Sequence, residues 1–240
     1  MTYKKPISLL PINEALRLQK LRDYQILDTH SEDTFDKIAL LASQIFNTPS
    51  AYVTFVDEKR VYLKATVGGF NLTEIPREQS LCSLAILDEK TTLFNDTHTI
   101  PDLVQNPLVS NSDGIRFYAG APLKSPEGYS VGTVCVVDSI PREATEEQLA
   151  MLRTLSDIVM NKLESRLRYH TIIKSQNDLM GIALHEIKNP VASISLANDI
   201  LRIDPTKVPK MTDMIKRCVV TIQAKLADLL KLSEDEETDQ

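Results

Sequence analysis

The sequence contains little glycine. It has 7 glycines in 240 residues, and the last of them is Gly181. The final quarter of the chain therefore cannot form a glycine-rich loop of the kind that binds phosphate groups through backbone N–H groups.

Cysteine, long apolar runs and positive charge are also scarce. The 3 cysteines, Cys82, Cys135 and Cys218, are far apart and form no C-x-x-C pair, which argues against a disulfide framework or a zinc site. No segment approaches the roughly 18 consecutive apolar residues of a membrane-spanning helix, and the N-terminal apolar stretch is too short for a signal peptide. A net charge of -6 disfavours nucleic acid as a partner. We therefore expect a cytoplasmic protein with no membrane insertion and no bound metal.

The first 140 residues or so have mixed α and β character. Amphipathic spacing predicts helices, and short β-branched and aromatic segments predict strands arranged in two hairpins. The predicted order is helix 13–27, helix 31–46, a hairpin of strands 50–57 and 61–68, a short helix 80–89, strand 91–96, loop 98–114, and a hairpin of strands 116–125 and 129–139.

The rest of the chain is predicted to be helical. Apolar residues at spacings of three and four indicate a coiled-coil stalk over 145–178, which overlaps the last helix of the first domain, or merely a packed helix: Leu152, Leu155, Val159, Leu163 and Leu167. Two further helices, about 174–203 and 210–232, would form a hairpin, and an acidic tail, 234–240, is expected to be disordered. Two such helices cannot enclose a core alone, so we expect a symmetric partner and a dimeric four-helix bundle.

The segment HEIKNP lies on the first helix of this hairpin. His185 falls opposite the main apolar stripe, where an exposed imidazole would be a competent nucleophile near neutral pH. Glu186 follows it and Asn189 lies one helical turn later, while Pro190 removes the backbone hydrogen bond to the Glu186 carbonyl and should bend the helix. A surface histidine beside a tolerated proline is the alternative interpretation.

This segment resembles the H-E-x-x-(T/N)-P box of the dimerisation and phosphotransfer (HisKA) domain of sensor histidine kinases, over about 174–233. The resemblance implies that His185 is the phosphoacceptor, Glu186 its catalytic base, Asn189 the residue that positions water in phosphatase action, and Pro190 the kink. Leu184 departs from the small residue common at its position.

The family's ATP-binding domain should follow the hairpin, but its glycine-rich motifs are absent from these 240 residues. We therefore expect no autonomous kinase activity and no cofactor in this chain. ATP and magnesium would enter only through an ATP-binding domain acting in trans or missing from this sequence.

The first domain resembles a GAF domain over about 14–165, after a short extension, 1–13. The resemblance rests on IPREQSLCSLAI, NPLVSNSDGIRFYAGAPL and VGTVCVVDSIPR, and it implies an α+β fold in which helices pack on an antiparallel sheet. A ligand pocket between the sheet and the loops would include five residues, which could equally be ordinary core: Phe55, Cys82, Ile115, Phe117 and Tyr118. The small-molecule ligand, if any, is not identified by these residues.

Together the two resemblances predict a bacterial-type two-component signalling protein. The GAF domain would sense a signal and control a homodimeric hairpin that relays phosphate from His185 to a response regulator. One alternative is a non-catalytic dimerising regulator of a partner histidine kinase. A remote one is a GAF-type methionine sulfoxide reductase using cysteines, although Cys135, in an apolar strand, is expected to be buried and inert.

Overall fold

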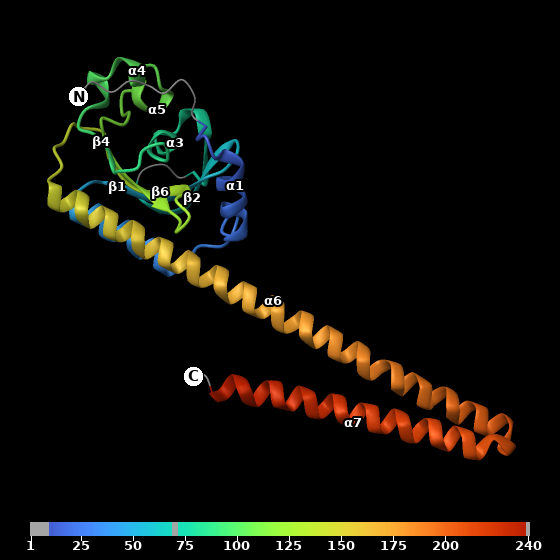
Figure 1. Ribbon diagram of the computed structural model, residues 1–240. Helices are drawn as coiled ribbons and strands as arrows, with labels where there is room; N and C mark the ends of the chain where they lie inside the picture. The colour runs from blue at the N-terminus through green and yellow to red at the C-terminus, as the bar shows by residue number, and fades with distance from the viewer. Residues whose placement is uncertain (1–9, 69–71, 239–240) are drawn as a thin grey trace. The chain divides into compact units, whose positions relative to one another are not determined.

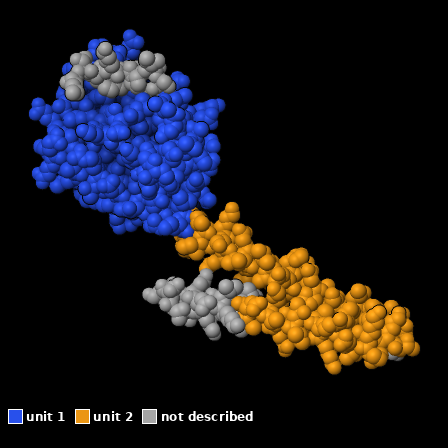
Figure 2. Space-filling model, viewed as in Figure 1, with its two compact units in different colours: residues 1–168 blue, residues 169–240 orange. Residues whose placement is uncertain are grey.

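The computed structural model describes residues 10–68 and 72–238 (Figure 1). The chain divides into two compact units, residues 1–168 and 169–240 (Figure 2). Most of the predicted extension 1–13 lies outside the described residues.

The first unit is built on an antiparallel sheet of six strands in the order β3-β2-β1-β6-β5-β4. The strands are β1 (Ser50–Val56), β2 (Arg60–Val67), β3 (Glu74–Pro76), β4 (Thr92–Phe94), β5 (Phe117–Lys124) and β6 (Ser130–Asp138). Both predicted hairpins are present as β1–β2 and β5–β6, and they join through the pairing of β1 with β6. Gly128 supplies the positive φ of 91° in the turn between β5 and β6, a conformation that side chains with a Cβ rarely adopt.

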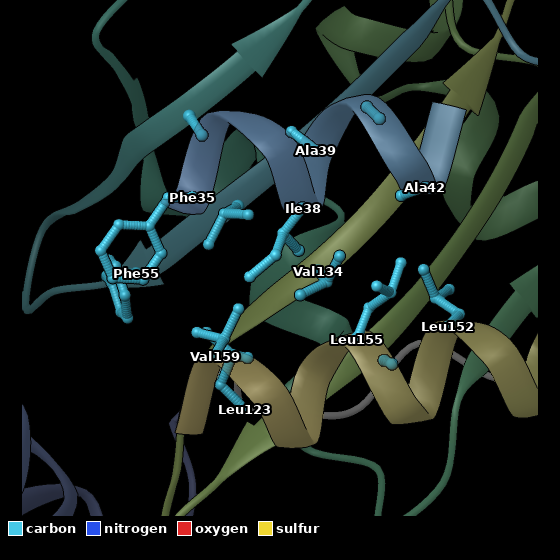
Figure 3. Close-up of a cluster of buried hydrophobic side chains, with 14 of the residues drawn as sticks. Phe35, Ile38, Ala39, Ala42, Phe55, Leu123, Val134, Leu152, Leu155 and Val159 are labelled. Carbon is cyan, nitrogen blue, oxygen red and sulfur yellow. The ribbon is translucent and has the colours of Figure 1, made fainter. Parts of the chain in front are cut away.

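One face of the sheet is covered by helices. These are α1 (Glu14–Asp23), α2 (Asp33–Phe46) and the first part of α6 (Glu146–Ile203). Figure 3 shows α2 and α6 placing their apolar side chains against the same strands, with Ile38 and Leu155 on either side of Val134. Burying this large apolar surface is the main stabilising contribution to the unit.

The opposite face is covered by short helices and loops, and it has its own apolar cluster. The helices are α3 (Cys82–Ala85), α4 (Pro101–Val104) and α5 (Pro107–Ser110), with 3-10 turns at Arg77–Gln79 and Thr97–Thr99. The predicted loop 98–114 thus contains two short helices, each beginning at a proline, whose fixed φ suits the first helical turn.

The leucine repeat packs on the first domain, and the coiled coil predicted over 145–178 stays a prediction. Leu152, Leu155, Val159 and Leu163 are buried against the sheet and Leu167 packs beside them, so their spacing reflects a helix packed on the first domain. The stalk and the first hairpin helix, predicted separately, are one continuous helix, α6. Residues 146–180 contain no glycine or proline that would end it, and the helix continues through Gly181 and Pro190.

The second unit contains the remainder of α6, a 3-10 turn (Pro205–Lys207) and α7 (Val208–Thr238). α7 is longer than predicted and includes most of the acidic segment 234–240, so the expected disordered tail is helical as far as Thr238. No helix among the described residues is both long and apolar enough to cross a lipid bilayer.

Candidate functional site

His185 lies on the part of α6 that belongs to the second unit, and its side chain is exposed. Asn189 follows it by four residues and is also exposed. Because residues four apart lie on the same side of a helix, the imidazole and the amide share one solvent-facing surface. The imidazole is therefore open to a protein or nucleotide approaching from solution.

Glu186 is tied to the second helix of the hairpin. Lys225 Nζ, on α7, lies 2.9 Å from a carboxylate oxygen of Glu186. Hydrogen bonding to this carboxylate raises the pKa of Lys225 above its ordinary value. The pair bridges α6 and α7 one residue from the imidazole, and sequence reasoning missed Lys225 because no local pattern links residues this far apart.

Pro190 is accommodated within α6, which continues to Ile203. Beside it, the Ser193 hydroxyl donates a hydrogen bond to the Asn189 carbonyl at 3.1 Å. Such a contact with the carbonyl four residues earlier often accompanies helix bending. The bend predicted at Pro190 stays a prediction.

The apolar stripe predicted on α6 largely faces α7. Ala183, Ile187, Ile194 and Leu201 are at least partly buried, whereas Leu179 is exposed. On α7, the inward residues begin with Met211, which is buried, and continue with three partly buried residues, Ile215, Cys218 and Ile222. His185 lies outside this interface, as the stripe predicted.

The first unit contains a small cavity between the sheet and the covering loops. Its volume is about 30 Å³. Of the five residues predicted to line a pocket, three do so: Cys82, Ile115 and Tyr118. The other two, Phe55 and Phe117, lie on the opposite face in the core formed with α2 and α6, so the prediction for them is wrong.

The alternation of side chains along a strand explains this correction. Phe117 and Tyr118 are neighbours on β5, so they must point to opposite faces of the sheet. A pocket on one face can therefore include only one of them. Phe55 is excluded in the same way, since Tyr52 and Thr54 of β1 are the residues that reach the cavity.

The cavity contains a group of polar side chains that sequence reasoning did not bring together. Cys82 Sγ lies 3.7 Å from Cys135 Sγ, and the hydroxyl of Thr54 on the cavity wall lies 2.9 Å from that of Thr133 behind the wall. The Tyr118 ring lies across Gly120, where a Cβ would fall 2.3 Å from the tyrosine hydroxyl oxygen. Cys135 is buried as predicted, but it lines the cavity together with Cys82.

The contact between the two thiols shifts their pKa values in opposite directions. The hydrogen bond from Cys135 lowers the pKa of Cys82 below its ordinary value although burial opposes this, and the hydroxyls of Thr133, Thr54 and Tyr118 act in the same direction. The same hydrogen bond, together with burial, raises the pKa of Cys135. Among the described residues, no group of three or more histidine, cysteine, aspartate or glutamate side chains is placed to hold a metal ion.

Comparison with known families covers both units. The GAF domain model matches residues 30–163, and the His Kinase A (phospho-acceptor) domain model, HisKA, matches residues 175–238. The cyclic di-GMP phosphodiesterase PA2567 of Pseudomonas aeruginosa is 32% identical over 156 residues, which are 65% of this chain and 26% of that protein. The chain thus spans about a quarter of the length of this relative.

The chain is also similar to three solved structures of low sequence identity. The GAF domain of the Acinetobacter phosphoenolpyruvate-protein phosphotransferase is 16% identical with a TM-score of 0.47, covering 66% of this chain and 96% of that one. The PixJ GAF domain of Thermosynechococcus elongatus is 12% identical with a TM-score of 0.45, covering 68% and 96%. The free methionine-R-sulfoxide reductase of Neisseria meningitidis is 17% identical with a TM-score of 0.47, covering 70% and 98%.

The two family matches lie in succession and follow the two units of the structure. The GAF match extends over more than half of the chain, and the HisKA match includes His185 and both helices of the hairpin. The chain therefore belongs to the GAF domain family, and its GAF and HisKA matches together are those of a sensor histidine kinase of two-component signalling.

Proposed function

We propose that this chain is a phosphorelay component in which the GAF domain controls the phosphorylation of His185 and the transfer of that phosphoryl group to a response regulator. The observation that carries the proposal is the exposed His185 on the HisKA hairpin, with Glu186 beside it and Asn189 on the same surface. An exposed position suits a phosphoacceptor histidine that must contact first an ATP-binding domain and then the receiver domain of a response regulator.

The first step is attack of a His185 ring nitrogen on the γ-phosphorus of ATP. A nitrogen–phosphorus bond forms, the bond from the γ-phosphorus to the bridging oxygen breaks, and ADP leaves. The Glu186 carboxylate accepts the imidazole proton, since general bases of this kind act through direct proton transfer. ATP would be held by an ATP-binding domain acting in trans or lying outside these 240 residues.

The second step transfers the phosphoryl group to an aspartate of a receiver domain. The nitrogen–phosphorus bond breaks as an aspartate oxygen attacks phosphorus, and the imidazole recovers a proton. In the opposing phosphatase reaction, the Asn189 amide would orient the water that hydrolyses the receiver's phosphoaspartate. Both reactions use the same exposed surface of α6.

The proposal includes a homodimer. Val208, Val219 and Leu226 of α7 are exposed, and their spacing places them on one strip beside the buried inner face. A strip of exposed apolar side chains of this kind is costly in an isolated hairpin. Pairing two hairpins would bury both strips in a four-helix bundle.

The test is phosphate transfer to the purified chain from ATP and a histidine kinase ATP-binding domain supplied in trans. We expect acid-labile, alkali-stable label on the wild type that moves to an added receiver domain. His185→Gln should remove the label, whereas His170→Gln, on the same helix, should keep it.

Label that persists in His185→Gln would overturn the assignment of the acceptor. Absence of label with every kinase domain that forms a complex with the chain would overturn the phosphorelay and support the non-catalytic dimerising regulator instead.

A further inference from the structure

Two thiols face each other in the cavity of the GAF domain. Cys82 stands at the start of α3, and Cys135 lies in the middle of β6. They are far apart in the sequence, yet their sulfur atoms are 3.7 Å apart and both side chains are buried. We propose that Cys82 and Cys135 form a peroxide-reactive dithiol that closes reversibly to an intramolecular disulfide.

The separation of the sulfur atoms is the first support. A disulfide bond is about 2.05 Å long, so closing the pair requires the sulfur atoms to approach by roughly 1.6 Å. Rotation of the two side chains with a small shift of α3 can supply a movement of this size. Cys218, by contrast, is on α7 in the other unit and provides an internal reference thiol.

The surrounding groups favour reaction at Cys82. The hydroxyls of Thr54, Thr133 and Tyr118 lower the pKa of the Cys82 thiol through hydrogen bonds, and no described residue that lines the cavity carries a positive charge. The thiolate is the nucleophilic form of cysteine. The hydrogen bond with Cys82 and burial raise the pKa of Cys135, so we assign Cys82 as the attacking thiol and Cys135 as the resolving thiol.

The size of the cavity selects the oxidant. A volume of about 30 Å³ holds a molecule close to the size of water. Typical ligands of drug or nucleotide size occupy pockets of about 300 Å³ or more. The volume of the cavity therefore suits hydrogen peroxide better than larger hydroperoxides.

The reaction balances with hydrogen peroxide as the two-electron oxidant. The Cys82 thiolate attacks one peroxide oxygen, the oxygen–oxygen bond breaks, and the departing hydroxide takes up a proton to leave as water. The resulting sulfenic acid of Cys82 is then attacked by the sulfur of Cys135. The sulfur–sulfur bond forms, and the sulfenic hydroxyl leaves with the Cys135 proton as a second water.

The experiment treats the reduced full chain with hydrogen peroxide, blocks the remaining thiols after denaturation, and maps peptides by mass spectrometry without reduction. We expect a linked Cys82–Cys135 peptide, a mass loss of about 2 Da per chain, and reversal by dithiothreitol. The pair should react at least about tenfold faster than Cys218. The Cys218→Ser variant should form the Cys82–Cys135 disulfide at the same rate as the wild type.

Two further variants assign the roles of the thiols. Cys135→Ala should accumulate a dimedone-reactive sulfenic acid on Cys82, and Cys82→Ala should leave Cys135 unlabelled. The wild-type map needs neither variant, so it remains decisive if one of them fails to fold. Oxidation of Cys218 with Cys82 and Cys135 still reduced would overturn the proposal, and so would dimedone labelling of Cys135 in place of Cys82. Neither result depends on phosphate transfer to His185.

Discussion

Lys225 Nζ lies 2.9 Å from a carboxylate oxygen of Glu186, so α7 holds the side chain that follows the proposed phosphoacceptor. Both partners remain substantially exposed, at 40% and 45% of their side-chain surface, and water and salt therefore screen the pair. The contact orients the Glu186 carboxylate more than it stabilises the hairpin.

This arrangement predicts different consequences for the two partners. Glu186→Gln should lower the rate of His185 phosphorylation by about 100-fold or more, since it removes a general base. Lys225→Met should change the rate by no more than about fivefold, because an exposed ion pair contributes little. The measurement is single-turnover phosphate transfer from ATP with a kinase domain in trans.

The charge-reversed double variant, Glu186→Lys with Lys225→Glu, distinguishes the structural role of the ion pair from the role of Glu186 as a general base. It should recover the thermal stability lost in either reversed single variant, because the ion pair is restored. It should not recover phosphate transfer. Recovery of transfer in the double variant would show that Glu186 acts only as a structural partner of Lys225.

If the hairpin dimerises as proposed, a charged substitution should weaken the homodimer on one side of α7 only. Val219 and Val220 are neighbours of the same residue type, but helical geometry places them about 100° apart. Val219→Asp should weaken the homodimer at least tenfold, because it would bury a charge in the bundle. Val220→Asp is the matched control and should leave the dimer intact. Sedimentation equilibrium measures both, and equal effects would contradict the proposed interface.

The sequence predicted secondary structure more reliably than which surfaces meet. Short segments rich in β-branched and aromatic residues correctly predicted the hairpins, and helical spacing correctly predicted α2. However, the spacing of Leu152 and Leu155 is the same in a coiled coil and in a helix packed on a sheet. Only the presence of the sheet distinguishes these alternatives.

In the candidate sites, too, local motifs could be predicted from the sequence, whereas contacts between distant segments could not. HEIKNP is a local motif, so His185 and Asn189 could be found on one helix surface from their spacing alone. The proximity of Cys82 to Cys135 depends on how β6 and α3 pack, and no local pattern encodes it. Strand alternation could have shown that Phe117 and Tyr118 point to opposite faces.

Replacing glycine by alanine should change the free energy of unfolding in opposite directions at Gly132 and at Gly181. In Gly132→Ala the added Cβ would fall 2.0 Å from the Thr54 carbonyl oxygen and 3.0 Å from the Phe55 Cα, both backbone atoms of the adjacent strand. We expect a loss of at least about 2 kcal/mol in the free energy of unfolding. In Gly181→Ala the Cβ meets nothing within 4 Å, and alanine favours a helix by about 0.5–1 kcal/mol.

Thermal and urea unfolding of both glycine variants test this prediction, with near-ultraviolet circular dichroism reporting on the aromatic core of the GAF domain. A stable Gly132→Ala protein with unchanged unfolding would show that β1 and β6 can separate without cost. Destabilisation by Gly181→Ala would show that Gly181 has a role that its open surroundings do not reveal.

The pH dependence of stability should include a contribution from Glu14. Its carboxylate accepts two hydrogen bonds of 2.8 Å from the buried Arg17 and one of 2.5 Å from Arg77. Burial alone would raise the pKa of Glu14, but the hydrogen bonds and charges of the two arginines hold it below the ordinary value of 4.5. A lowered folded-state pKa stabilises the protein above the unfolded-state pKa, and this stabilisation is lost as the pH falls through the folded-state value.

Glu14→Gln should therefore lower the free energy of unfolding by about 2 kcal/mol at pH 7, because it leaves two buried guanidinium groups without their carboxylate. The difference from the wild type should persist to pH 5 and shrink as the pH falls below 4.5, where Glu14 begins to bind a proton in the unfolded state but not yet in the folded state. Urea unfolding between pH 7 and pH 3.5 measures this difference. The exposed Glu89 provides the matched control, since Glu89→Gln should leave the profile unchanged. A deficit in Glu14→Gln that stays constant down to pH 3.5 would show that the cost arises from packing, because lost packing does not titrate.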